Sequence, residues 1–167
     1  MHSRVVKPKC GPQLTLRPLR PGDTETVQAV FERLSEGSRL ARFNGLKQRL
    51  GEQELRWLAN VGPNHHVLVG YVDADPEPVA IARLVRFGDT AEVAFEVADE
   101  YQGRGIGSAL TQELIADACA AGIVRVTALV RSDNPAALAV LQRTLGQLEV
   151  RFEGPEMLVR ASVPAVC

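Results

Sequence analysis

Residues 97–108 read Val97-Ala98-Asp99-Glu100-Tyr101-Gln102-Gly103-Arg104-Gly105-Ile106-Gly107-Ser108, and this stretch decides the fold. A strand pattern runs directly into a turn that carries three closely spaced glycines. A helix is predicted from Gly105 to Ala121, because apolar residues recur every four positions after Gly105. The unpaired N–H groups and the dipole of such a helix start favour a phosphate group. Glycines let phosphate oxygens approach the backbone, and Arg104 adds a local positive charge.

Two common phosphate-binding motifs do not fit this turn. A Walker loop requires Gly-Lys followed by Ser or Thr, and no such triplet is present. In a dinucleotide fingerprint counted from Gly103, Ser108 stands where the third glycine is required, and that fingerprint normally follows the first strand of a parallel sheet. A glycine-rich turn without a ligand is the alternative, although three glycines and an arginine exceed what such a turn needs.

The remaining pattern predicts an α+β fold with one domain over residues 13–167. Helices are predicted at 24–34 with Asp23 as N-cap, 38–43, 52–60 and 135–145. Strands are predicted at 14–17, 66–72, 79–86, 90–98, 124–130, 148–152 and 156–160. This order indicates a mixed, mostly antiparallel twisted sheet of about six to seven strands with helices on both faces. Residues 1–12 are polar and interrupted by two prolines, so they are predicted to be a disordered lead-in.

The composition is ordinary for a soluble globular protein, with 46% apolar and 23% charged residues. A net charge of −1 gives no attraction to nucleic acid or to an anionic membrane surface. No apolar run approaches the roughly 20 residues of a membrane span, and no CxxC or Cys/His cluster offers a metal site. The sequence therefore predicts a cytoplasmic protein that binds neither nucleic acid, nor membrane, nor metal.

The turn at 102–107 resembles a known cofactor loop. Gln102-Gly103-Arg104-Gly105-Ile106-Gly107 is similar to the Q/R-x-x-G-x-G/A pyrophosphate loop of the GNAT acetyltransferase superfamily, and the element order resembles that fold over about residues 14–162. The resemblance implies an acyltransferase that uses acetyl-CoA as co-substrate. It further implies that Val97 and Ala98 pair with the pantetheine arm and that Asn134 contacts the cofactor. The implied pyrophosphate ligands are Gln102, Gly103, Arg104, Gly105, Ile106, Gly107 and Ser108.

Two carboxylates on the strand before the turn are candidates for the general base. An amine acceptor must lose a proton before it attacks, since a lysine with a pKa near 10.4 is charged at neutral pH. Glu92 and Glu96 share one face of the strand, because side chains alternate. A solvent-facing polar side of an amphipathic strand is the alternative. The resemblance favours Glu92, which falls at the position of the catalytic Glu in protein-lysine members of the superfamily, with Glu96 second.

The sequence departs from the superfamily at the acid that protonates the leaving thiol. Many members carry a Tyr about seven residues after the Asn, and here Leu141 occupies that position. The spacing of Leu141 with Leu138 and Leu145 predicts a core position. A thiol with a pKa near 8.5 leaves without full protonation. The difference therefore implies a subfamily that dispenses with this acid.

A second resemblance concerns the acceptor. The segment 34–45 is similar to the L-S-x-x-S-x-x-x-R-F segment of Pat-type bacterial protein lysine acetyltransferases. It implies transfer to a protein lysine, for example of an acyl-CoA synthetase, by direct attack, and members of the superfamily often form homodimers. Alternatively, Arg42 and Phe43 anchor the predicted helices to the sheet. A small-molecule amine acceptor and a non-catalytic acyl-CoA-binding module also stay open.

Overall fold

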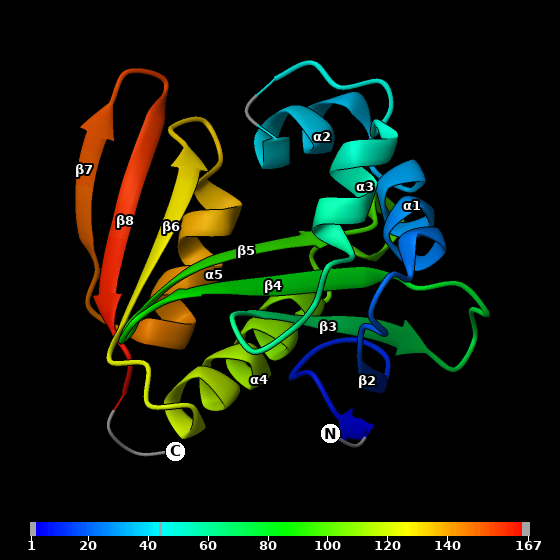
Figure 1. The fold of residues 1–167 in the computed structure, drawn as a ribbon, viewed down its shortest axis with the longest axis horizontal. Coiled ribbons are helices and arrows are strands. Elements are labelled where there is room, and N and C mark those ends of the chain that lie inside the picture. The colour runs from blue at the N-terminus through cyan, green and yellow to red at the C-terminus, as the bar shows by residue number, and fades with distance from the viewer. Residues whose placement is uncertain (1–2, 44, 165–167) are drawn as a thin grey trace.

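A single mixed sheet runs through the molecule, and helices pack against both of its faces (Figure 1). The computed structural model describes residues 3–43 and 45–164. Within these residues lie eight strands, five α-helices and one 3₁₀ helix. No helix in this part of the chain is long and apolar enough to cross a membrane.

The N-terminal half contains three helices, which lie in the chain between β2 and the strands β3 to β5. The helices are α1 (Thr24–Glu32), α2 (Glu36–Phe43) and α3 (Glu52–Leu58). The strands are β2 (Leu14–Pro18), β3 (His65–Val72), β4 (Ala80–Phe87) and β5 (Thr90–Val97). Asp23 is confirmed as the N-cap of α1, since its carboxylate accepts a hydrogen bond from the backbone N–H of Thr26 at 3.0 Å.

The C-terminal half alternates between helices and strands. A 3₁₀ helix, η1 (Asp99–Tyr101), leads into α4 (Ile106–Ala120). The elements that follow are β6 (Arg125–Arg131), α5 (Pro135–Leu145), β7 (Glu149–Glu153) and β8 (Glu156–Ser162). Each range predicted from the sequence differs from these bounds by at most two residues.

The described part of the N-terminal segment, residues 3–12, corrects the prediction of a disordered lead-in over residues 1–12, of which residues 1 and 2 lie outside the described residues. Arg4–Val6 forms β1, which pairs antiparallel with β2. Arg4 makes ion pairs with Glu113 at 3.1 Å and with Asp117 at 2.5 Å, both on α4. The two ion-pair partners of Arg4 lie more than 100 positions away in the sequence, so local composition does not reveal them. The same strand raises the strand count above the predicted six to seven.

The sheet confirms the predicted α+β class. Its strand order is β1-β2-β3-β4-β5-β6-β8-β7, and neighbouring strands are antiparallel except for β5 and β6. That parallel pair joins the N-terminal meander to the C-terminal strands. The connection between β5 and β6 contains α4, as a parallel crossover requires.

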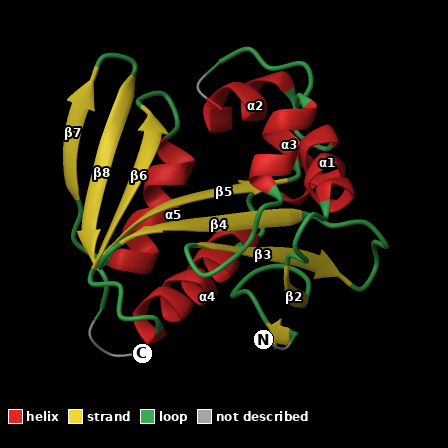
Figure 2. Ribbon diagram, in the orientation of Figure 1, coloured by secondary structure: helices red, strands yellow, loops and turns green. Residues whose placement is uncertain are grey.

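Helices cover both faces of the sheet (Figure 2), and each face has its own apolar core. On one face, α4 and α5 bury Ile106, Leu110 and Leu141 against the strands. On the other face, α1 and α3 bury Phe31 and Leu58 against the N-terminal strands. Strands covered on both faces have little freedom to move, so the sheet is a rigid support for the groove described next.

Candidate active site

A groove opens where β5 and β6 separate. The two strands pair only between Thr90–Glu92 and Arg125–Thr127, although both continue well beyond this register. Figure 1 shows them diverging from their paired ends. The separated edges, together with α2, the start of α4 and α5, enclose a groove of about 420 Å³. The groove thus leaves backbone groups of both strands without a strand partner.

The structure brings about half of the predicted cofactor residues to this groove. Those that line it are Val97, Gln102, Gly103, Gly107 and Asn134. Gly105 and Ser108 belong to the same helix start but do not line the groove. Ala98 and Ile106 are buried in the core, so they offer at most backbone groups. Arg104 is exposed and lies over the ring of Tyr101, with its guanidinium carbon 5.3 Å from the ring centroid.

The start of α4 has the geometry of an anion site. Gly103 and Gly105 adopt left-handed backbone conformations, with φ of +72° and +76°. Gly105 is the N-cap of α4, and it provides no side-chain hydrogen bond to the first turn. The first N–H groups of the 15-residue helix therefore stay available, and the helix dipole adds a positive potential. Successive N–H groups of this kind are suited to phosphate oxygens.

Hydrogen bonds connect this turn to α2. The side-chain amide of Gln102 donates to the hydroxyl of Ser38 at 3.1 Å and to the carbonyl of Val97 at 3.0 Å. Asp99 accepts a hydrogen bond from the backbone N–H of Ser35 at 3.0 Å. Gln102 therefore holds the turn and α2 in one position.

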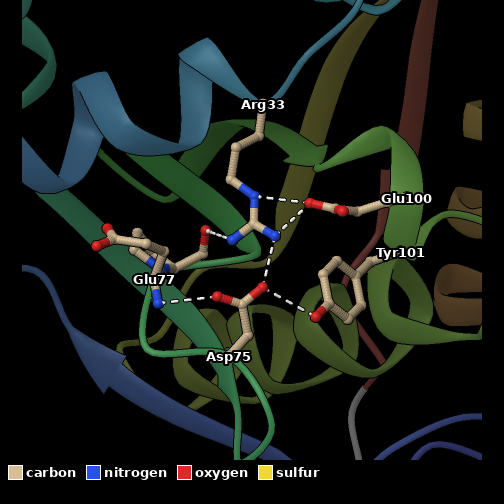
Figure 3. A network of polar contacts seen from close by, with 6 residues as sticks. Arg33, Asp75, Glu77, Glu100 and Tyr101 are labelled. Carbon is tan, nitrogen blue, oxygen red and sulfur yellow. Dashed lines mark hydrogen bonds and ion pairs between the residues drawn. The ribbon is translucent and has the colours of Figure 1, made fainter.

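A polar network centred on Arg33 fixes the other side of the turn (Figure 3). The guanidinium of Arg33 bonds to Asp75 at 2.5 Å and, through Nε, to Glu100 at 2.9 Å. Asp75 also accepts hydrogen bonds from the hydroxyl of Tyr101 at 2.9 Å and from the backbone N–H of Glu77 at 3.0 Å. The hydrogen bond from Arg33 lowers the pKa of Asp75 to about 2. The network ties the end of α1, the β3–β4 turn and η1 together.

Glu96 is buried and paired with two arginines. Its Oε1 contacts Nη2 of Arg83 at 3.1 Å, and its Oε2 contacts Nε of Arg42 at 2.5 Å. Burial lowers the pKa of Arg83 to about 10, so this side chain stays charged at neutral pH. Both carboxylate oxygens are thus engaged in ion pairs. Its geometry therefore indicates that it holds α2 against β5.

Glu92 has different surroundings. It is exposed and lies opposite Thr127, at the last register position before β5 and β6 separate. Its neighbour Val93 lines the groove, but Glu92 itself does not, whereas the buried Glu96 does. Of the two predicted carboxylates, Glu92 is thus the exposed one without an ion-pair partner among the described residues, and it lies one position beyond the groove.

The structure also decides two further predictions and adds residues that sequence reasoning missed. Leu141 is fully buried, which confirms its predicted core position. Arg42 and Phe43 anchor α2, since Phe43 packs edge-on against Phe31 with ring centroids 5.6 Å apart.

Two buried or half-buried arginines of the site, Arg33 and Arg83, were not predicted from the sequence. Their ion-pair partners lie 13 to 67 positions away, and no local motif marks them.

Comparisons with known proteins agree with this geometry. The family model described as "Acetyltransferase (GNAT) family" matches residues 29–147. The chain is 37% identical over 166 residues to Acetyltransferase Pat of Mycolicibacterium smegmatis. That match covers 96% of this chain and 49% of Pat, so the chain spans about half the length of this curated relative.

Solved structures show the same architecture. The GNAT domain of S. lividans PAT superimposes with a TM-score of 0.87 at 26% identity, covering 96% of each chain. The PaiA N-acetyltransferase of Thermoplasma acidophilum, solved in complex with coenzyme A, has a TM-score of 0.70 at 16% identity, covering 89% of this chain and 98% of that one. At that identity the likeness to PaiA shows the fold alone. The family match, the likeness to Pat and the shared fold show that the chain belongs to the GNAT acetyltransferase family.

Proposed function

We propose that this chain transfers the acetyl group of acetyl-CoA to the side-chain amine of a protein lysine, with Glu92 as general base. The observation that carries the proposal is the groove between β5 and β6, which extends from the uncapped start of α4 to Val93, the neighbour of the exposed Glu92. The likeness to Pat over 96% of the chain supports this acceptor class. Within the segment 34–45, residues 36–43 form α2, and several residues between Leu34 and Arg42 line the groove, as those of an acceptor-binding element would.

The described residues fit acetyl-CoA. The N–H groups of Gly105, Ile106, Gly107 and Ser108 would hold the pyrophosphate, with Gly103 allowing close approach and Arg104 adding charge. The unpaired edge of β5, ending at Val97, would bind the amides of the pantetheine arm. Asn134 caps α5 by accepting the N–H of Ala137 at 3.1 Å, which leaves its side-chain amide nitrogen to donate to the cofactor.

The chemistry assigned to the chain is limited to positioning and one proton transfer. Acetyl-CoA supplies an acetyl thioester. Glu92 accepts the proton of the lysine ammonium, directly or through one water, so that the neutral nitrogen attacks the carbonyl carbon. Backbone N–H groups on the separated strand edge stabilise the developing oxyanion while the C–N bond forms and the C–S bond breaks. Leu141 provides no acid, and a thiolate is basic so weakly that it leaves without one. The second proton of the attacking nitrogen passes to the departing thiolate or to solvent, which completes the amide.

The surface beside Glu92 favours a protein lysine over a polyamine. A polyamine site is expected to be deep and lined with carboxylates. Here the hollow beside Glu92 is lined by Arg125 and Arg160 with a single carboxylate, Glu149, and by Thr127, which lies opposite Glu92. Such a surface carries too few carboxylates for a polyamine, so we infer a polypeptide laid across the strands.

A free-thiol release assay with acetyl-CoA tests the proposal. The acceptors are an AMP-forming acyl-CoA synthetase, the same synthetase with its active-site lysine changed to arginine, a polyamine and an aminoglycoside. We expect release only with the unmodified synthetase. Thiol release with the polyamine or the aminoglycoside would instead indicate that the acceptor is a small-molecule amine. Binding of acetyl-CoA with no accelerated release would leave a non-catalytic acyl-CoA-binding module.

The oligomeric state is a separate proposal. The homodimer implied by the family resemblance is tested by sedimentation at two protein concentrations, with and without acetyl-CoA. A single species of 18.1 kDa under all conditions would rule it out.

A further inference from the structure

A row of polar side chains crosses the sheet from Glu92. In the strand register, Glu92 lies opposite Thr127, Thr127 opposite Arg160, and Arg160 opposite Glu149. Side chains at matched register positions point to the same face of a sheet. Val126, which alternates with Thr127, is buried in the core formed with α4 and α5. The row therefore lies on the opposite face, where Glu92 is exposed.

Two arginines meet in one hollow on this face. Arg125 stands opposite Thr90, one row away from Arg160. Thr90, Arg125, Thr127, Glu149 and Arg160 together line the hollow, and none of the five lines the groove between β5 and β6. Two guanidiniums against one carboxylate leave the hollow with an excess of positive charge and of hydrogen-bond donors. It is thus a second surface hollow, separate from the groove.

These two arginines differ from other arginines of strands β6 and β7. Arg131 is paired with Asp133 at 2.7 Å, and Arg151 is within 3.5 Å of Glu153. Among the described residues, Arg125 and Arg160 make no ion pair within 4.0 Å. Unpaired guanidiniums that converge on one hollow are suited to a carboxylate, which they bind through two parallel N–H donors.

We propose that Arg125 and Arg160 bind an acidic side chain of the acceptor protein close to its target lysine. The inference rests on the proposed function and adds a sequence preference to it. Arg160 is two strands from Glu92, a distance of about 10 Å at the usual strand spacing. An extended chain advances about 3.3 Å per residue, so the acidic residue is expected about three positions from the lysine. Glu149 repels an anion from the outer side of Arg160 and directs it toward Arg125.

Peptides with blocked termini test this preference. Each contains one lysine in a Gly/Ala host and a single Glu placed two, three or four positions before or after it. A matched set has Gln at the same places. For the unmodified protein we expect a value of kcat/KM about 3- to 20-fold higher for the best Glu peptide than for its Gln match, mostly through KM. The ratio should fall as salt is raised, because the arginines are exposed.

Three variants locate the preference. R125Q and R160Q should each reduce the Glu-to-Gln ratio, and the double variant should bring it near one while turnover of the Gln peptide stays within about twofold. R151Q is the matched control, since it removes an exposed arginine of the same sheet that already has an acidic partner. It should keep the full ratio.

The outcomes separate the inference from the proposed function. Equal kcat/KM for every Glu and Gln pair would overturn the inference and leave lysine acetylation intact. A preference that survives in the double variant would place the acidic subsite elsewhere and also overturn it. If neither the peptides nor the synthetase is acetylated while acetyl-CoA still binds, the proposed function fails, and the inference fails with it.

Discussion

At the scale of single residues, Glu92 and Glu96 lie four positions apart on one strand and have opposite surroundings. Glu92 is exposed one position beyond the groove, whereas Glu96 is 6% exposed and held between two guanidiniums. Burial of a carboxylate is tolerated only when it is paired, so we assign Glu96 a structural role and propose Glu92 as the base.

Changing these carboxylates should therefore affect different quantities. Glu92→Gln should lower kcat by about 10²–10⁴-fold with little change in acetyl-CoA affinity, because the amine loses its base. Glu96→Gln should instead lower the free energy of unfolding by about 3 kcal/mol, because it leaves Arg83 without its charge partner. Steady-state kinetics and urea unfolding of both variants check this. Unchanged kcat in Glu92→Gln would remove Glu92 from the mechanism.

Gly11 packs against the glycine-rich turn at residues 102–107, where its backbone lies close to Arg104. Its backbone has φ of +123°, and a Cβ added there would lie 2.4 Å from the carbonyl oxygen of Arg104. Gly11→Ala should therefore displace the turn and weaken acetyl-CoA binding several-fold, in addition to its cost in backbone strain. Gly88→Ala is the control, because Gly88 also has positive φ, at +67°, but its Cβ would contact nothing. Equal acetyl-CoA affinity of the two variants, measured by titration calorimetry, would contradict the expected displacement.

At the scale of elements, Arg33 joins three segments that are distant in sequence. Figure 3 shows its guanidinium between Asp75 of the β3–β4 turn and Glu100 of η1. Tyr101 completes the network from the side of η1. Since η1 leads directly into the glycine-rich turn at residues 102–107, the network fixes the position of the first residues of that turn.

The low pKa of Asp75 makes this network sensitive to acid. The native pKa of about 2 lies below the ordinary value of 3.8, so Asp75 adds stability that is fully present above pH 4. That stability is lost as the pH falls from about 4 through 2. The difference in unfolding free energy between the unmodified protein and Asp75→Asn should therefore be largest at neutral pH and shrink below pH 4. Urea unfolding at pH 7, 4 and 3 checks this, and a difference that does not change with pH would refute it.

At the scale of the whole molecule, the groove divides the sheet into two parts. The meander up to β5 lies on one side, and the strands β6, β8 and β7 lie on the other. A ligand in the groove contacts both parts, so it should stabilise the native state as a unit.

Acetyl-CoA should accordingly raise the free energy of unfolding. At a concentration one hundred times its Kd, the expected gain is about 2.7 kcal/mol. Thermal unfolding with acetyl-CoA, ATP and NAD at equal concentrations measures it. We expect the largest increase in Tm with acetyl-CoA, because the turn lacks the Walker lysine and the third dinucleotide glycine. A larger increase with ATP or NAD would indicate a nucleotide site instead.

The sequence by itself determined the helices and strands other than β1, and it marked the glycine-rich turn at the start of α4. Helix α5 has the predicted bounds, and Asp23 and Gly105 mark the starts of α1 and α4. These features depend on backbone propensity, apolar period and capping, which act over a few neighbouring residues and can be read locally.

Only the tertiary structure decided which side chains meet. It paired Arg4 with α4, placed Glu96 between Arg42 and Arg83, and left Glu92 exposed beside the groove. The strand pattern puts both glutamates on one face, but burial depends on what covers that face, and α2 covers only the end near Glu96. Contacts between distant segments form only when the chain is compact, because their loop-closure entropy is offset by burial of the whole core. The balance between loop-closure entropy and core burial depends on the whole chain, so no short stretch of sequence reveals it.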